Sequence, residues 1–312
     1  MSTRGKVRKA VIPVAGRGVR MLPATKSYPK EMFPILGTPV LQYVVEEAVR
    51  SGITDILMII GKRKNAIMDY FNRDFELENH LAQKGKDDLL KEIERISNLA
   101  NIYFTYQKES KGLGDAVSYA EEFIGNEPFA LLLGDNIFYS KTPCTAQLIS
   151  IFDRYQVSVI MVEKVPEFKV SRYGIIKGRK IGERLFEIED LVEKPSLEEA
   201  PSNFAIGGRY IITPDIFSCI RRTPPGRGGE VQITDALRLL NRKLGYITEG
   251  KRYDIGDKLD YLKAQIELGL KREEFRDELR EYLESLCKNV CSEEGTCYDH
   301  QKTDKSEDRS NW

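Results

Sequence analysis

The feature that most constrains the fold is the alternation of short apolar runs with amphipathic stretches along residues 9–133. Residues 9–14 (KAVIPV) and 53–60 (ITDILMII) have the length and composition of strands that are buried on both faces. A stretch with apolar residues at helical spacing follows each run, at residues 38–52 and 65–71. Strands that alternate with helices in this way predict a parallel sheet that carries helices on both faces.

The same pattern sets the expected domain boundaries. Residues 75–100 are charged and predict an amphipathic helical insertion that breaks near Gly85. Beyond residue 134 the alternation is less regular, so we expect one Rossmann-like, mostly parallel α/β domain over residues 1–272. Residues 273–312 predict a charged helix and then a flexible polar tail, because they are too hydrophilic to build a core. The other predicted elements are strands at residues 102–106, 129–133, 157–162 and 205–212, and helices at residues 114–123, 231–243 and 259–271.

Charge and hydropathy exclude several classes of protein. The 312 residues include 48 basic and 48 acidic ones, a formal net charge of zero, which argues against a protein that coats nucleic acid. The apolar run behind the basic N-terminus is too short for a signal peptide, and no run approaches the ~20 apolar residues of a membrane span. We therefore expect a cytoplasmic protein with no nucleic-acid or membrane partner.

An odd number of cysteines in a chain without a secretion signal predicts reduced thiols. They are Cys144, Cys219, Cys287, Cys291 and Cys297. The last three lie near His300, and three thiols with one imidazole could close a tetrahedral zinc shell. Their spacing matches no familiar zinc ribbon, so free cysteines are the favoured interpretation.

The first turn after the predicted strand is rich in glycine. Residues 16–23 (GRGVRMLP) place backbone N–H groups at the carboxyl edge of the sheet, where they can form an anion-binding nest. An ordinary tight turn is the alternative. A nicotinamide-dependent oxidoreductase would need a third glycine at position 21, which is Met, and a phosphate-binding Walker loop would end in Gly-Lys-Ser/Thr. Instead, Arg20, Lys26 and Lys30 follow the glycines, although Lys26 could equally be a solvated surface charge.

The order of these residues resembles the sugar-nucleotide pyrophosphorylase family. The match begins with Gly16 to Thr25 and Pro29-Lys30, and it covers roughly residues 8–272. It is closest to the bacterial and archaeal branch that transfers a uridylyl group. The further matching blocks are residues 75–78 (FELE), 111–114 (KGLG), 192–195 (VEKP), 201–203 (PSN), 208–210 (GRY) and 223–235 (TPPGRGGEVQITD).

The resemblance implies a role for each matching residue. Nucleotide binding falls to Ala15, Gly16, Gly18, Gln107 and Gly112. The catalytic cations would be Arg20, Lys30 and Lys194. The sugar phosphate would be held by Tyr173, Gly174, Glu193, Lys194 and Asn203. The metal-side carboxylates would be Asp135 and Asp254.

The two acids differ in how clearly their positions in the sequence fit a metal site. Asp135 directly follows a buried strand, so it should lie at the carboxyl edge of the sheet, although a turn aspartate is the alternative. Asp254 has a rival in Asp257, and either could cap the next helix. An amide such as that of Gln107 can meet both a donor and an acceptor on a pyrimidine.

The activity that the resemblance implies is Mg²⁺-assisted, in-line transfer of uridylate from UTP to glucose 1-phosphate, without a covalent intermediate. A homodimer or homotetramer is also implied.

Two departures from the family pattern concern which nucleotide base the protein would bind. Val19 stands where the family usually has Thr, and Leu133 to Asn136 (LGDN) looks like the thymidylyl branch. Use of dTTP, alone or beside UTP, is therefore an alternative, and a non-catalytic sugar-nucleotide sensor is a less favoured one.

Overall fold

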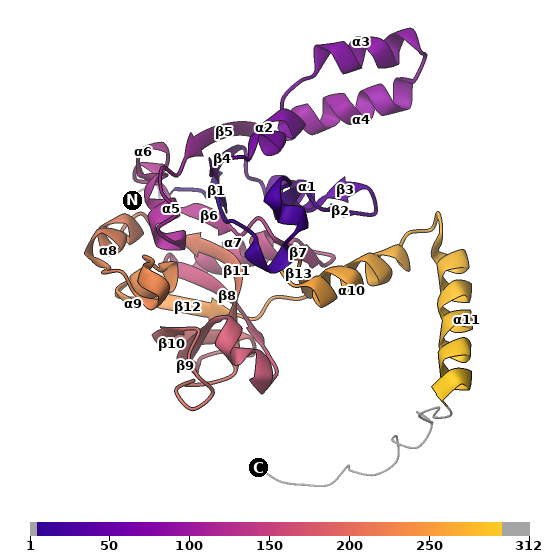
Figure 1. Cartoon of the computed structure of the whole chain (residues 1–312). Helices are drawn as coiled ribbons and strands as arrows, with labels where there is room; N and C mark the ends of the chain where they lie inside the picture. Colours follow the sequence, from indigo (N-terminus) through magenta and orange to yellow (C-terminus); the bar gives the residue numbers. More distant parts are fainter. Residues whose placement is uncertain (1–4, 295–312) are drawn as a thin grey trace. The chain divides into compact units, whose positions relative to one another are not determined.

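The computed structural model describes residues 5–294, and their contacts divide the chain into two compact units. The first unit runs to Tyr261 and the second begins at Leu262, so the division falls within helix α10 (Lys258–Gly269). Figure 1 shows the ribbon. The predicted functional division after residue 272 stays a prediction.

Within the described residues of the first unit, nine strands form one mixed sheet (Figure 1). Their order across the sheet is β5 (Asn101–Tyr106), β4 (Asp55–Ile60), β1 (Lys9–Val14), β6 (Phe129–Leu132), β11 (Phe204–Ile212), β8 (Ser158–Lys164), β12 (Lys243–Tyr246), β10 (Leu185–Glu193) and β9 (Gly174–Lys180). Pairing is parallel from β5 to β6, and β11 then runs antiparallel to both of its main neighbours. The predicted parallel sheet is therefore confirmed for one half, whereas the other half is mixed.

Two small two-stranded sheets lie beside the main sheet. Strands β2 (Pro34–Ile35) and β3 (Thr38–Pro39) pair with each other, and β7 (Asn136–Tyr139) pairs with β13 (Lys251–Asp254). The β7–β13 pair places Asp254 directly opposite Asn136. A residue distant in the chain is thereby brought next to Asp135.

Helices cover both faces of the sheet, as the alternation predicted. Neighbouring residues of β1 point to opposite faces: Val11 belongs to one apolar cluster, and Ala10 and Ile12 to another. The first face is covered by α5 (Leu113–Ser118), α6 (Glu121–Ile124), α8 (Ile216–Arg222) and α9 (Ile233–Arg238). The second is covered by α1 (Val40–Arg50), α2 (Asn65–Phe71), α4 (Asp87–Ser97) and α7 (Cys144–Tyr155).

Short helical turns and the predicted insertion complete the first unit. Helices α3 (Phe75–Gln83) and α4 form the helical pair, which breaks at Gly85 as predicted. The 3-10 turns are η1 (Val19–Met21), η2 (Ala24–Lys26), η3 (Lys30–Met32), η4 (Glu167–Arg172) and η5 (Arg227–Gly229).

Two element predictions are wrong. The helix predicted from residue 38 begins only at Val40, because residues 38–39 pair with β2. The helix predicted over residues 231–243 ends at Arg238, and β12 follows almost at once. The local β2–β3 pair replaces the start of the first predicted helix, and the pairing of Lys243 with Ser158 of β8 replaces the end of the second.

The second unit carries the charged helix that the sequence predicted. Its helix α11 (Arg276–Glu294) is polar, with Tyr282 and Leu286 exposed. Cys287 is an exposed free thiol, whereas Cys144 and Cys219 are buried and free. The Cys291 side chain, Cys297, His300 and the predicted flexible tail from residue 295 lie outside the described part. No helix within residues 5–294 has the length and apolar character needed to cross a membrane.

Candidate active site

Three adjoining cavities of the first unit lie along the carboxyl ends of the parallel strands. The basic cavity, of about 610 Å³, is lined by residues 15–17, 25–30, 61–64 and 107–110. The bridging cavity, of about 240 Å³, shares Ala15, Lys30 and Gln107 with it. The mixed-charge cavity, of about 260 Å³, shares Asp135 and Glu230 with the bridging cavity. Together the three form one cleft.

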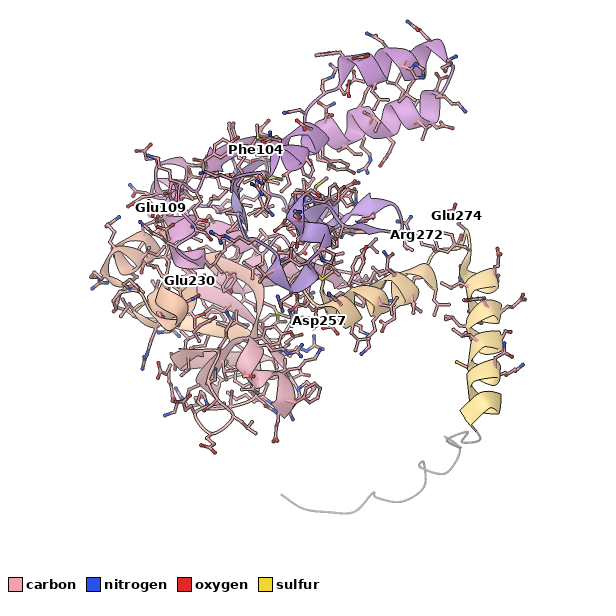
Figure 2. The ribbon with its side chains drawn as sticks, in the orientation of Figure 1. Phe104, Glu109, Glu230, Asp257, Arg272 and Glu274 are labelled. Atoms are coloured by element: carbon pink, nitrogen blue, oxygen red, sulfur yellow. The ribbon has the colours of Figure 1, made fainter. Side chains whose placement is uncertain are left out.

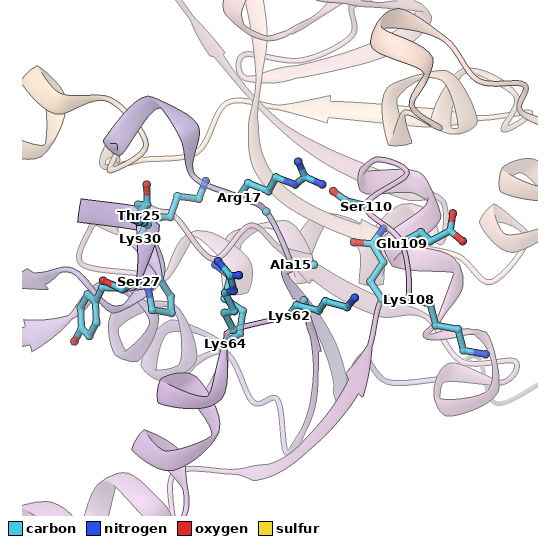
Figure 3. A pocket seen from close by; sticks show the side chains of 17 residues that line it. Ala15, Arg17, Thr25, Ser27, Lys30, Lys62, Lys64, Lys108, Glu109 and Ser110 are labelled. Carbon is cyan, nitrogen blue, oxygen red and sulfur yellow. The ribbon is translucent and has the colours of Figure 1, made fainter. Parts of the chain in front are cut away.

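The basic cavity has cations on several loops. Figure 3 shows Thr25, Ser27 and Lys30 on one side of it and Lys108, Glu109 and Ser110 on the other. The cations that line it are Arg17, Lys26, Lys30, Lys62, Arg63, Lys64 and Lys108. Glu109 is the one acid among the lining residues, so the cavity is suited to an anion.

The glycine-rich turn is held in shape by its own residues. Gly18 has φ 64°, in the left-handed region that glycine tolerates, and its carbonyl accepts a hydrogen bond from Thr25 Oγ1 at 2.8 Å. A Cβ at Gly16 would meet no atom within 4 Å, so the backbone there faces open space. Ala15 and Gly16 line the basic and bridging cavities, whereas Gly18 lines none of the three.

An ion pair joins the nucleotide-side cation to the predicted metal-side acid. Lys30 Nζ bonds Asp135 Oδ2, and Asn136 Nδ2 donates to Asp135 Oδ1 at 2.9 Å. Burial alone would raise the pKa of the Asp135 carboxyl, but the charges of Lys30 and Arg20 outweigh it, and the pKa falls below its usual value. For Lys30, burial alone would lower the pKa of the ammonium group. The charge of Asp135 outweighs this effect, and the pKa of Lys30 is raised.

The second acid lies close to the first. Asp254 is buried, and the amide of the next residue, Ile255, donates to the backbone oxygen of Asp135 at 2.9 Å. Burial raises the pKa of the Asp254 carboxyl, and the charge of Asp135 raises it further. Arg20 is packed here too, since a Cβ on Gly256 would come within 2.6 Å of Arg20 Nη2. The rival Asp257 instead pairs with Arg172 at 3.0 Å and caps α10.

The sugar-side residues are brought together by one hairpin. Strands β9 and β10 pair so that Gly174 lies opposite Glu193, and the Lys194 amide donates to the Tyr173 carbonyl at 3.0 Å. Lys194 Nζ lies 3.2 Å from Glu193 Oε1. Lys194 has φ 45°, in the left-handed region. Residues other than glycine seldom adopt this conformation, and those that do are frequently found at functional sites.

The other oxygen of Glu193 is also held. Thr234 Oγ1 donates to Glu193 Oε2 at 2.6 Å. A Cβ at Gly174 would come within 2.9 Å of Thr234 Oγ1, so only glycine fits beneath this carboxylate. Asn203, by contrast, lies just before β11 and lines none of the three cavities.

Known proteins are similar to this chain over most of its length. The model of the family described as "Nucleotidyl transferase" matches residues 9–269. The chain belongs to the nucleotidyl transferase family.

Relatives of this nucleotidyl transferase are similar along nearly their whole length. The UTP–glucose-1-phosphate uridylyltransferase YngB of Bacillus subtilis is 52% identical, over 93% of this chain and 99% of that one. UTP–glucose-1-phosphate uridylyltransferase 1 of Staphylococcus saprophyticus is 48% identical, over 91% and 100%. The resemblance to sugar-nucleotide pyrophosphorylases is therefore confirmed.

Solved structures show the same fold. A UDP-glucose pyrophosphorylase complexed with UDP-glucose is 41% identical, with a TM-score of 0.79 over 85% of this chain and 100% of that one. A UTP-bound UGPase from Acinetobacter baumannii is 37% identical, with a TM-score of 0.82 over 89% and 98%.

The transferase also contains buried residues near the site whose role could not be predicted from the sequence. Arg209 is 1% exposed and forms an ion pair with Glu47 at 2.9 Å. Its guanidinium also donates to the carbonyls of Leu133 and Asn136, at 3.2 and 2.7 Å. Arg209 therefore holds the loop that carries Asp135. An arginine within the apolar run at residues 205–212 was the available signal, because such a charge is seldom buried without a partner.

Arg252 holds residues around the second acid, Asp254. It donates to Asn136 Oδ1 at 2.7 Å and to Glu163 at 2.6 Å. Its guanidinium lies 4.8 Å from the centre of the Tyr173 ring, and the Tyr173 hydroxyl donates to Asp254 at 3.3 Å. No signal in the sequence distinguished Arg252 from its basic neighbours.

Proposed function

We propose that this transferase joins UTP and glucose 1-phosphate into UDP-glucose and pyrophosphate. The observation that carries the proposal is the meeting of Arg20, Lys30, Asp135 and Asp254 where the bridging and mixed-charge cavities adjoin. Relatives at about half identity over almost their entire length are named for this reaction, which supports the same choice of substrates.

The reaction is an in-line displacement. A phosphate oxygen of the sugar phosphate attacks the α-phosphorus of UTP, a new P–O bond forms, and the bond to the bridging oxygen breaks as pyrophosphate leaves. Lys194 would contact the attacking phosphate, and Glu193 would accept hydrogen bonds from the sugar hydroxyls. Arg20 and Lys30 would neutralise the leaving pyrophosphate. Glu193 is held in place by Thr234, so it is ready to receive a sugar before one binds.

The remaining assignments complete the two substrate subsites. Backbone groups of Ala15, Gly16 and Gly112 would approach the nucleotide, with Gln107 reading the base. Tyr173 and Gly174 would border the sugar phosphate. Gly18 would act by shaping the turn rather than by contact. Asn203 is the weakest assignment, because it lies away from the three cavities.

The two acids fit a divalent cation, and we propose Mg²⁺. Asp135 and Asp254 offer the hard oxygen ligands that Mg²⁺ prefers, on one cavity. Burial raises the pKa of Asp254 and the charge of Asp135 raises it further, and a cation beside both carboxylates would offset these two effects. When bound, Mg²⁺ would neutralise phosphate charge. No group of three or more His, Cys, Asp or Glu residues suited to a metal occurs within residues 5–294, so substrate oxygens and water would complete its shell.

Release of pyrophosphate from the purified full chain tests the proposal. Triphosphates (UTP, dTTP, CTP, ATP, GTP) are crossed with the 1-phosphates of glucose, galactose and N-acetylglucosamine, with Mg²⁺ and then with EDTA. We expect the highest kcat/KM for UTP with glucose 1-phosphate, and loss of turnover in EDTA. No release with any pair contradicts the proposal, and equal use of dTTP supports the dual-nucleotide alternative.

The cytoplasmic location and the homodimer or homotetramer stay predictions. Light scattering on the protein as it elutes from a size-exclusion column tests the oligomeric state.

A further inference from the structure

We propose that Asp115, a residue with no assigned role, fixes the orientation of the Gln107 amide and thereby makes this enzyme reject cytosine nucleotides. The inference rests on the proposed function, which it deepens by naming the residue behind base choice. Asp115 would be a positioning residue, because it touches Gln107 and not the base.

The Gln107 side chain is held by two neighbours. It lies just beyond β5, is 7% exposed, and lines both the basic and bridging cavities. Its Nε2 donates to Asp115 Oδ2 at 2.7 Å and to the Gly112 carbonyl at 3.2 Å. Asp115 lies in the first turn of α5, directly behind the loop that contains Gly112.

Both neighbours are acceptors, and this determines which end of the amide faces them. A carboxylate and a backbone carbonyl accept hydrogen bonds and donate none. If the amide were flipped, its oxygen would lie against two other oxygens, and its two N–H groups would lose their partners. The amide is therefore locked with its nitrogen toward Asp115. Within the described residues, no hydrogen bond reaches Gln107 Oε1, which is left as an acceptor.

The loop that supplies the second acceptor is itself rigid. Val231 N donates to the Lys111 carbonyl at 2.7 Å, and Gly114 N donates to the Val231 carbonyl at 2.8 Å. Gly112 has φ 105°, and a Cβ there would come within 2.7 Å of the Val231 oxygen. Glu109 and Glu230, labelled in Figure 2, belong to the two segments that these bonds join. The carbonyl of Gly112 therefore cannot turn away from Gln107.

A locked acceptor selects the base by its hydrogen-bond pattern. Uracil and thymine carry a hydrogen on N3, which can donate to Gln107 Oε1. Cytosine has a bare N3, which would bring two acceptors together and leave both unpaired. A site built around such a hydrogen bond rejects the mismatched analogue strongly. The pair does not separate uracil from thymine, which differ only in a methyl group at C5.

The experiment measures kcat/KM for UTP and for CTP, with glucose 1-phosphate, in wild type and in Asp115→Asn. The asparagine amide can meet either end of Gln107 with little change in volume, so only the longer bond to the Gly112 carbonyl still favours the native orientation. We expect the UTP-to-CTP ratio to fall at least about tenfold. Glu122→Gln removes one negative charge from an exposed position on nearby α6 and should leave the ratio unchanged. Melting temperatures show that each variant is folded.

A double variant separates positioning from a general structural effect. In Gln107→Ala, adding Asp115→Asn should change the UTP-to-CTP ratio no further, because the residue that Asp115 orients is gone. An unchanged ratio in the single variant, or an equal fall in the Gln107→Ala background, overturns the inference. Neither result touches the proposed function, which fails only if wild type makes no UDP-glucose from UTP. Calorimetric binding of UMP and CMP gives the same comparison without turnover.

Discussion

The side of the cleft assigned to the nucleotide and the side assigned to the sugar phosphate are built differently. The nucleotide side uses loops that directly follow the parallel strands β1, β4 and β5, so short stretches of sequence place its groups. The sugar side uses the antiparallel pair β9–β10 together with Thr234, Arg252 and Asp254, which come from much later in the chain. The first subsite is therefore local in sequence, and the second depends on tertiary pairing.

The two sides also differ in charge. The basic cavity has one acid among many cations, as a triphosphate requires. The mixed-charge cavity opposes four acids (Asp135, Glu193, Glu230 and Asp254) with four cations (Arg20, Arg172, Lys194 and Arg252). The acids there could bind a metal ion and accept hydrogen bonds from sugar hydroxyls, and the cations could bind phosphate. Substitutions on each side should therefore affect different substrates.

The largest expected effect is at Asp135, which belongs to both sides. Asp135→Asn keeps the volume but removes the charge that would face Mg²⁺ and that pairs with Lys30. We expect kcat to fall roughly a thousandfold, with excess Mg²⁺ restoring only part of it. Steady-state turnover at increasing Mg²⁺ measures this. The exposed acid Asp69, changed to Asn, is the matched control and should behave as wild type. Full activity of Asp135→Asn would remove this residue from the site.

Lys194→Ala should separate the two subsites. The loss of its ammonium group should lower kcat/KM for glucose 1-phosphate about a hundredfold, because a charge that stabilises the transition state is gone. Calorimetric affinity for UTP should stay within about twofold, since Lys194 lines only the mixed-charge cavity. Lys177→Ala, at an exposed position on β9, is the control. A large loss of UTP affinity instead would mean that the two sides are not separate.

The same contrast explains what the sequence could predict. The bounds of β1 and α2 agree with the prediction, because apolar pattern and turn residues determine them locally. The glycine turn and Asp135 could be placed for the same reason, since they follow closely on β1 and β6.

Long-range pairing was beyond prediction from sequence. The sequence does not indicate β12, and the helix predicted over residues 231–243 includes its first residue, because nothing local shows that this strand inserts between β8 and β10. Arg209 bonds a glutamate 162 residues away, so its support of the Asp135 loop appears only in three dimensions. The proposed role of Asp115 likewise depends on a contact that the sequence does not indicate, the hydrogen bond of 2.7 Å from Gln107 Nε2 to its carboxylate.

Glycine substitutions on the nucleotide side should show a smaller effect. In Gly16→Ala the new Cβ meets no protein atom within 4 Å, so the melting temperature should not change. The methyl group would instead occupy space that the nucleotide needs, and we expect KM for UTP to rise about tenfold. Gly112→Ala should behave differently, because its Cβ collides with the Val231 carbonyl and its φ is positive. That variant should lose stability as well as UTP affinity, and unfolding curves beside initial rates distinguish the two.

The smallest expected effect is at the opposite edge of the sheet, where a change should leave both subsites intact. Asp55, at the start of β4, accepts hydrogen bonds from Thr54 at 2.7 Å and Asn101 at 3.1 Å. The Thr54 hydrogen bond lowers the pKa of Asp55 despite the opposing effect of burial. Because the folded state binds this proton less tightly than the unfolded chain, the stabilisation is present above the unfolded pKa of about 3.9 and is lost as pH falls further.

Asp55→Asn should therefore lower the free energy of unfolding at pH 7 by less than about 1 kcal/mol, the scale of exposed charge interactions. Near pH 3.5 the difference should shrink, because most of the unfolded chain is then protonated at Asp55 and part of the advantage of the folded carboxylate is lost. Urea unfolding at the two pH values measures this, and turnover at pH 7 should equal that of wild type. A stability loss that is the same at both values would show that the charge of Asp55 is not its cause. A loss of turnover would show instead that the amino edge of the sheet is coupled to the cleft at its carboxyl edge.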